Sequence, residues 1–373
     1  MVRVEPFTVE QWMDKYETTP GVLNISETCA ASISINELAK LSTDSNAQTP
    51  FDPNDKMTYG AIRGSQELRE HIASFCSANF LALYTLVGPG DHVVCVYPTD
   101  QHLYAVPASL GAETTLWKLR KEKGYVPDTT ELGSLVKENT KVIIVNNPRS
   151  PTDEVFRPLW HSLPTGTAAP PPATALGHKR TIVTGSMSKT SALAGIRLEW
   201  IASCDSSIIE AIAAARDYTT ISISNVDDRI AAFALSPSVQ PSLLRRNKDL
   251  AAHNLKLVKA FVKKYAAVCS WHEPQAGTTA FIQFRSKGKP IKDTDFCIDL
   301  LNKTKVLLVP GSHCFGGDID FEGHVRIGYV SETPVLEEGL QKLGARQAAI
   351  STETTGAKAL DLGVSPTSWA EPE

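Results

Sequence analysis

The sequence predicts an α/β fold in which helices cover both faces of a mainly parallel sheet. Between residues 80 and 145, short apolar runs typical of buried strands alternate with helical stretches. A long amphipathic helix over residues 247–265 is followed by further apolar runs, which predict a second, smaller α/β unit. The boundaries that we expect are 45–245 for a large domain, 1–44 with 246–345 for a small domain, and 346–373 for a disordered tail.

Composition narrows the class of protein. The chain has 373 residues, of which 42% are hydrophobic and 21% are charged, and its net charge is −4. These values are ordinary for a soluble globular protein and favour neither nucleic acid nor a membrane as a partner. The first residues lack the apolar core of a signal peptide, and no run reaches the length of a membrane helix. The seven cysteines form no Cys-x-x-Cys pair, so we expect reduced thiols in a cytoplasmic protein and no metal site.

The elements follow from the spacing of apolar residues. A period of three to four residues predicts helices, and short β-branched or apolar runs predict strands. The expected helices cover residues 6–18, 33–42, 65–75, 80–86, 104–112, 131–138, 208–215 and 247–265. The expected strands cover residues 22–25, 92–97, 114–119, 141–145, 281–284, 306–309 and 325–329.

Asn147 follows the strand over residues 141–145 almost directly. In open parallel sheets, ligands bind at the carboxyl ends of the strands, so the position suits a ligand-binding side chain. A turn-forming Asn-Pro pair explains the residue equally well when it is taken alone.

One stretch carries a distinctive set of polar residues between two apolar runs. Ser186, Ser188 and Lys189 follow a β-branched run that begins at Thr181, and Arg197 precedes the next apolar run. A lysine amine can form an imine with an aldehyde, while hydroxyls and an arginine can hold a phosphate. Taken alone, the lysine is explained as well by an exposed loop. A nucleotide P-loop is excluded because the glycine that should precede the lysine is Ser188.

Further segments now identify a family. The chain resembles the fold-type-I pyridoxal-phosphate enzymes, specifically class I and II aminotransferases of the aspartate aminotransferase type, and it is also similar to the capreomycidine-synthase-like branch. The resemblance covers about residues 20–345 and implies a seven-stranded, mainly parallel sheet with a second, smaller α/β domain. The segments that carry it, in family order, are Tyr59-Gly-Ala-Ile-Arg-Gly64, Gly88-Pro-Gly-Asp-His-Val93, Asn147-Pro-Arg-Ser-Pro-Thr152, Asp153-Glu-Val-Phe156, Ser186-Met-Ser-Lys189, Gly195-Ile-Arg197 and Val325-Arg326-Ile-Gly328.

The resemblance implies a pyridoxal phosphate cofactor bound as a Schiff base to Lys189, which then acts as general base on the substrate. Asp153 would pair with the pyridinium nitrogen, and Asn147 would donate to the phenolic oxygen. The resemblance thus assigns one residue to each polar atom of the ring.

The remaining implied roles concern the phosphate and the substrate. Ser186, Ser188 and Arg197 would bind the phosphate, and Tyr59 would reach the phosphate of the partner subunit in a homodimer. Arg326 would bind the substrate α-carboxylate as a bidentate fork. The implied substrates are an amino acid and a 2-oxo acid.

The chain departs from the family in its cofactor-binding half. Thr152 abuts Asp153, where the family has a strand and a helix, and a parallel crossover needs about a dozen residues or more. Residues 72–80 run on without the family's phosphate-binding strand and turn, Asp100 replaces an aromatic residue that stacks on the ring, and Phe156 replaces a tyrosine. We therefore expect an incomplete sheet and reduced or lost affinity for the cofactor.

The leading functional prediction is an aminotransferase. A carbon–sulfur lyase or an amino-acid cyclase on the same scaffold would share Lys189, Asp153 and Arg326, so the motifs do not separate these reactions. An alternative of another class is an inactive homologue that acts as a dimerising or binding protein, which the two apparent deletions favour.

Overall fold

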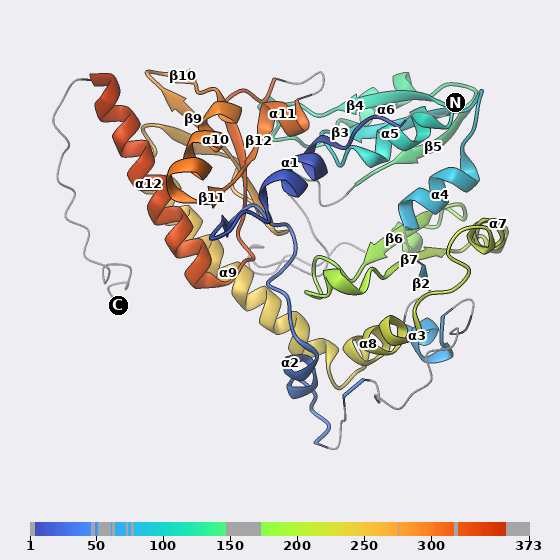
Figure 1. The fold of residues 1–373 in the computed structure, drawn as a ribbon. Coiled ribbons are helices and arrows are strands. Elements are labelled where there is room, and N and C mark those ends of the chain that lie inside the picture. The colour runs from blue at the N-terminus through green and yellow to red at the C-terminus, as the bar shows by residue number, and fades with distance from the viewer. Residues whose placement is uncertain are drawn as a thin grey trace.

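A computed structural model describes residues 4–45, 49–50, 61, 64–71, 74–75, 78–146, 173–274, 276–316 and 320–355. The architecture is mixed α/β, as predicted (Figure 1). Over these residues the strands form two three-stranded sheets, one five-stranded sheet and one two-stranded pair. The long helix α9 (Gln240–Lys264) packs against both α8 (Asn225–Leu235) and α12 (Thr333–Thr355) and so runs past several parts of the molecule.

The first three-stranded sheet is parallel and has strand order β4-β3-β5. Its strands are β3 (His92–Tyr97), β4 (Glu113–Lys118) and β5 (Thr140–Ile144). Its helices are α4 (Ala78–Leu86), α5 (His102–Ser109) and α6 (Thr129–Leu135). Every residue of β3 is buried, as expected for the central strand of a covered parallel sheet. Leu83 of α4 and Val106 of α5 pack with Val93 in one cluster.

The second three-stranded sheet has order β2-β7-β6, and both of its strand pairs are antiparallel. Its strands are β2 (Ser74–Phe75), β6 (Ile182–Ser186) and β7 (Glu199–Ser203). This small sheet is the antiparallel part of the N-terminal half, whereas the β4-β3-β5 sheet is parallel as predicted. The expected helix over residues 65–75 is wrong, since α3 (Gln66–His71) ends before β2, and this strand occupies a segment where we expected none.

Strand β5 is an edge strand of the first sheet, and β6 is an edge strand of the second. Within the described residues, neither strand has a second neighbour on its outer side. Both strands are only partly covered, and Ile143 of β5 is 43% exposed. The described strands of this half therefore lie in two separate sheets, which we together call the interrupted sheet. The expected loss of sheet segments stays a prediction, because residues 147–172 lie outside the described range.

The five-stranded sheet comes from the last third of the chain, has path β10-β9-β13-β12 with β8 beside β9, and is antiparallel throughout. Its strands are β8 (Cys269–Trp271), β9 (Thr279–Ser286), β10 (Lys289–Pro290), β12 (Val309–Pro310) and β13 (His324–Gly328). Residues from both ends of the chain complete this unit. The added elements are α1 (Thr8–Tyr16), β1 (Leu23–Asn24), which pairs with β11 (Val306–Leu307), α10 (Asp293–Thr304), α11 (Gly311–Phe315) and α12.

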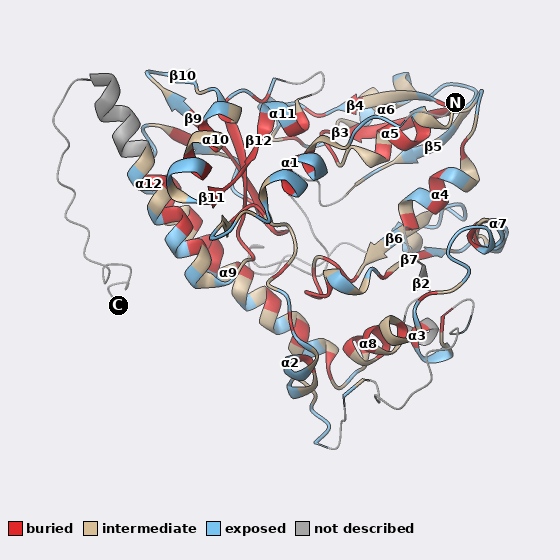
Figure 2. Ribbon diagram, in the orientation of Figure 1, coloured by how far each residue is buried: buried red, intermediate tan, exposed pale blue. Residues whose placement is uncertain are grey.

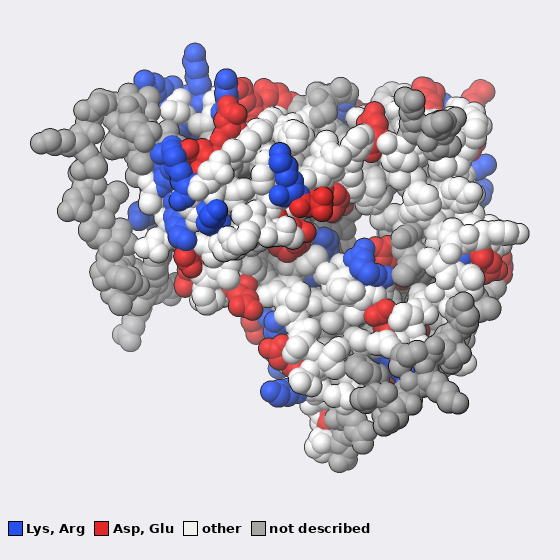
Figure 3. Space-filling model, in the orientation of Figure 1, with Lys and Arg blue, Asp and Glu red and all other residues white. Residues whose placement is uncertain are grey.

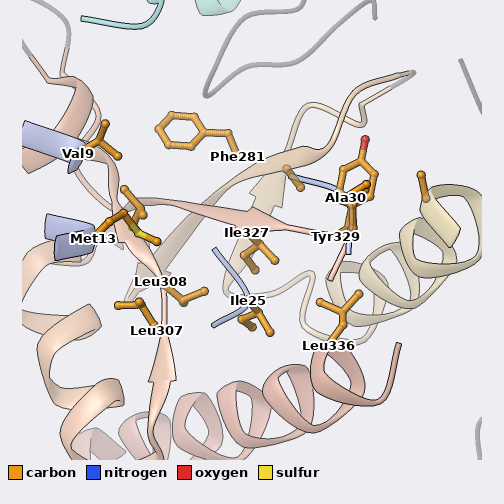
Figure 4. Close-up of a cluster of buried hydrophobic side chains, with 14 of the residues drawn as sticks. Val9, Met13, Ile25, Ala30, Phe281, Leu307, Leu308, Ile327, Tyr329 and Leu336 are labelled. Carbon is orange, nitrogen blue, oxygen red and sulfur yellow. The ribbon is translucent and has the colours of Figure 1, made fainter. Parts of the chain in front are cut away.

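The largest hydrophobic cluster includes the core of this C-terminal unit and extends to α8 and to the link between β6 and β7 (Figure 2). Figure 4 shows Val9 and Met13 of α1 on one side of it, with Ile25 below Ile327 and near Leu336. Residues from the N-terminal segment are thus part of a core built mainly by the C-terminal elements.

Helix α12 corrects one expectation. It continues to Thr355, so the disordered tail expected from residue 346 is wrong for the first ten of those positions, and residues 356–373 lie outside the described range. The remaining helices are α2 (Ile35–Lys40), α7 (Ser206–Asp217) and the short 3-10 turns η1 (Lys121–Lys123), η2 (Ala173–Leu176) and η3 (Ala194–Ile196). The domain boundaries at 45 and 245 stay a prediction.

Two surface properties complete the description. Among the described helices, none combines the length and apolar character that crossing a membrane requires. Acidic and basic side chains lie interspersed on the face shown in Figure 3.

Candidate active site

The β6–β7 hairpin brings the predicted phosphate ligands to one end of its sheet. Met187 N donates to Leu198 O at 3.0 Å, which extends the hairpin beyond β6. Ser188 N and the Ser186 hydroxyl are bonded at 3.1 Å, and the Ser186 hydroxyl donates to the Ser188 hydroxyl at 2.9 Å. Arg197 lies across the hairpin with a left-handed φ of 51° and donates to Ala194 O at 3.1 Å. The two hydroxyls are therefore in contact, and the guanidinium belongs to the same turn.

Lys189 follows these serines in the hairpin turn and is half-buried. Its Nζ donates to the Thr28 hydroxyl and contacts Cys29 Sγ at 3.6 Å. Both partners belong to the N-terminal segment, far from Lys189 in sequence. We name residues 25–31 the N-terminal strap.

Backbone hydrogen bonds hold the strap between the hairpin and the C-terminal sheet. Ala30 N donates to Lys189 O at 3.1 Å, and Ala31 N donates to Val330 O at 2.7 Å. Gly328 N donates to Ile25 O at 2.9 Å, and a Cβ atom at position 328 would lie 1.8 Å from Glu27 O. The strap can pass this close to β13 because glycine has no side chain.

Two apolar residues near the ends of the strap are buried in the hydrophobic core. Ile25 and Ala30 are 0% and 1% exposed, and both lie in the cluster shown in Figure 4. The polar residues between them, from Ser26 to Cys29, are thus presented to Lys189 from a rigid support.

Glu27 contributes a carboxylate near the lysine. Its Oε1 accepts from Thr28 N at 2.7 Å and from Cys29 N at 3.1 Å. Burial disfavours the charged form, but the Lys189 cation and these two N–H groups outweigh it and hold the pKa of Glu27 below its usual range. The carboxylate is therefore ionised at neutral pH.

The pKa of the Cys29 thiol is shifted in the opposite direction. Burial raises its pKa above the usual value, and nearby Glu27 adds to the shift, although Lys189 opposes it. The thiol is therefore protonated at neutral pH, and a protonated thiol is a weak nucleophile.

Arg326 contacts the strap at Ser26, before the residues that Lys189 contacts. It lies on β13, is 6% exposed, and its NH2 group donates to Ser26 O at 3.2 Å. Its guanidinium carbon also lies 5.5 Å from the centre of the Phe315 ring, within the range of a cation–π interaction. Arg326 and Lys189 therefore contact opposite ends of one short segment, Ser26–Cys29.

The remaining predicted residues are not placed. Tyr59, Asn147 and Asp153 lie outside the described residues. Thr28 and Cys29 contact Lys189, yet the sequence analysis did not select them. Nothing in the run Ser26-Glu-Thr-Cys29 marks it as part of a site, because its position depends on distant backbone contacts.

Comparison with known proteins was made against families, sequences and solved structures. The model of "Aminotransferase class I and II" matches residues 161–343. Capreomycidine synthase from Streptomyces vinaceus is 29% identical over 296 residues, which are 74% of this chain and 72% of that protein. Aspartate aminotransferase from Sulfolobus acidocaldarius is 23% identical and is covered over 81% of its length by 76% of this chain.

Two solved structures share the fold. A PLP-dependent aminotransferase from Streptococcus suis superposes with a TM-score of 0.79 at 29% identity, covering 92% of this chain and 97% of that one. A PLP-dependent cyclase superposes with a TM-score of 0.78 at 22% identity over the same fractions. These matches agree with the mixed α/β architecture described above. The chain is similar to the class I and II aminotransferases and has the fold of the fold-type-I pyridoxal-phosphate enzymes.

Proposed function

We propose that this chain is a pyridoxal-phosphate-dependent aminotransferase that moves an amino group from an amino acid to a 2-oxo acid. One observation carries the proposal: Lys189 and Arg326 contact the two ends of the segment Ser26–Cys29. An amino acid that places its carboxylate on a guanidinium and its amino group toward a lysine needs these two cations close together.

The functional groups of the residues at the hairpin suit those of pyridoxal phosphate. The Lys189 amine suits its aldehyde, and the Ser186 and Ser188 hydroxyls with the Arg197 guanidinium suit its phosphate. Pyridoxal phosphate is the cofactor of the structural relative from Streptococcus suis, and similarity to the family implies the same cofactor here. When bound, it supplies a carbonyl that an amine can capture and a ring that draws electrons from the substrate Cα.

The protein residues then have separate tasks. Lys189 holds the cofactor covalently and afterwards moves the proton at the substrate Cα. Arg326 orients the substrate through its α-carboxylate. Tyr59, Asn147 and Asp153 keep the roles that the family resemblance implies: the partner's phosphate, the phenolic oxygen and the pyridinium nitrogen. We also propose a homodimer in the cytoplasm.

Absorption spectroscopy tests the cofactor. Adding pyridoxal phosphate to the full-length protein should produce a band that the Lys189→Ala variant lacks. Amino transfer to a 2-oxo acid should fall by about 10²–10⁴-fold in that variant, the usual contribution of a general base. The interrupted sheet supports weaker cofactor binding than in a complete fold. No band in the wild-type protein would instead favour an inactive, dimerising homologue.

A cyclase is the second candidate, because capreomycidine synthase and the PLP-dependent cyclase are among the similar proteins. A carbon–sulfur lyase would also use the same lysine. Product analysis separates the three reactions. Transamination requires an added 2-oxo acid, whereas cyclisation or release of pyruvate, ammonia or thiol proceeds without an acceptor.

A further inference from the structure

The contacts of Lys189 extend beyond its immediate partners. Its Nζ donates to the Thr28 hydroxyl, and that hydroxyl donates to Glu27 Oε1 at 3.4 Å. The same carboxylate oxygen accepts the Thr28 and Cys29 backbone N–H groups. A chain of hydrogen bonds thus joins the lysine nitrogen to an anchored carboxylate.

We propose that Glu27, acting through the Thr28 hydroxyl, is a positioning residue that favours the protonated form of the Lys189 nitrogen. This inference rests on the proposed role of Lys189 as the cofactor lysine. A carboxylate within reach of a nitrogen cation stabilises the cation, and a bridging hydroxyl fixes the direction of the charge.

Protonation has a direct consequence for the reaction. A protonated nitrogen draws electrons from the carbon bonded to it, so an incoming amine attacks that carbon more readily. Glu27 would therefore assist the exchange of Lys189 for the amino group of the substrate. During protonation the nitrogen gains one proton and Glu27 stays ionised, so the net charge of the pair changes from −1 to zero.

Other charged or titratable groups surround this chain of hydrogen bonds. Cys29 contacts Lys189 directly, and Glu17 and Glu27 repel each other. Arg326 and Arg246 bind the strap through backbone oxygens, of Ser26 and Ala31 respectively. Among these groups, Glu27 is the carboxylate that the Thr28 hydroxyl joins to Lys189.

The first test uses the full chain without cofactor. Trinitrobenzenesulfonate reacts with neutral amines, so the rate at which it labels the Lys189 peptide, measured by mass spectrometry over a pH series, reports on protonation. The Glu27→Gln variant keeps an oxygen for both backbone N–H groups but loses the charge. We expect its Lys189 to be labelled about tenfold faster or more below the midpoint of the profile. Glu17→Gln, the same change in a neighbouring carboxylate, should leave the profile unchanged.

A pair of variants at Thr28 separates hydrogen bonding from packing. Thr28→Ser keeps the hydroxyl and loses the methyl group, and Thr28→Val keeps the shape and loses the hydroxyl. If the inference is correct, serine retains the wild-type profile and valine shifts it toward that of Glu27→Gln. The reverse result, or identical profiles for Glu27→Gln and the wild-type protein, would overturn it.

The second test adds pyridoxal phosphate and follows the Lys189-dependent band during a pH titration. In Glu27→Gln the titration should move to lower pH, and an unmoved titration contradicts the inference. Absence of the band in the wild-type protein would count against the proposed function, whereas the labelling series still decides the role of Glu27.

Discussion

The five-stranded C-terminal sheet and the interrupted sheet of the N-terminal half differ in how completely they are covered. In the C-terminal sheet every residue of β13 and six consecutive residues of β9 are buried. In the other half β3 is fully buried, but β5 and β6, the strands at the interruption, are largely half-exposed or exposed. Within the part of the chain that the structure describes, β5 and β6 each have a neighbouring strand on one side only, which leaves their side chains less covered.

Matched isoleucine truncations should give the largest effect of this comparison. Ile282 of β9 is 0% exposed and Ile143 of β5 is 43% exposed. Ile282→Ala should lower the free energy of unfolding by about 2–5 kcal/mol, because it leaves a cavity in a packed core. Ile143→Ala should cost less than about 1 kcal/mol, since water already reaches that side chain. Urea unfolding monitored by circular dichroism measures both, and equal losses would show that β5 is covered in solution.

The pH dependence of the C-terminal unit should be the next largest effect. Burial, with a smaller contribution from Lys121, lowers the pKa of His324 on β13 to about 4. The unfolded chain binds this proton below about pH 6.5 and the folded chain only near pH 4, so stability is lost as the pH falls between them. The loss is on the order of 3 kcal/mol. His324→Gln should flatten the thermal-unfolding profile in this window, and an unchanged slope would contradict the assignment.

The third comparison is between Gly328, which lies against the strap, and Gly133, a glycine in an open position. Gly328→Ala puts a Cβ atom against Glu27 O, whereas a Cβ atom at Gly133 of α6 meets nothing within 4 Å. Crowding at position 328 should cost about 1–3 kcal/mol. Gly133→Ala should change stability by less than about 1 kcal/mol, in the stabilising direction. Differential scanning fluorimetry compares the two variants, and a neutral Gly328→Ala would mean that the strap can move away.

Local patterns predicted the hairpin lysine and most strands. Lys189 and its serines are adjacent in sequence, and a β-branched run followed by small polar residues defines the strand and turn that carry them. Arg326 was found because its strand pattern and the family resemblance agree. The order of the family motifs also predicts that a crossover is missing between Thr152 and Asp153, and this stays a prediction because both residues lie outside the described range.

Other features were beyond the reach of local patterns. Thr28 and Glu27 have ordinary neighbours in sequence, and their place beside Lys189 follows from contacts with Gly328 and Val330. The end of α12 was missed because its last turns, beyond Leu343, lack an apolar stripe. A helix already nucleated by buried turns propagates through such residues at little cost.

The strap has a consequence for how the protein is made. Its residues leave the ribosome long before their hydrogen-bond partners at Gly328 and Val330, which lie far along the chain from the strap. Contacts of such large sequence separation form slowly, because closing the long loop between the two partners costs conformational entropy before the contacts can form. The surroundings of Lys189 are therefore completed only after β13 and Val330 have been synthesised, and a chain that stops short of β13 carries the lysine without the strap held beside it.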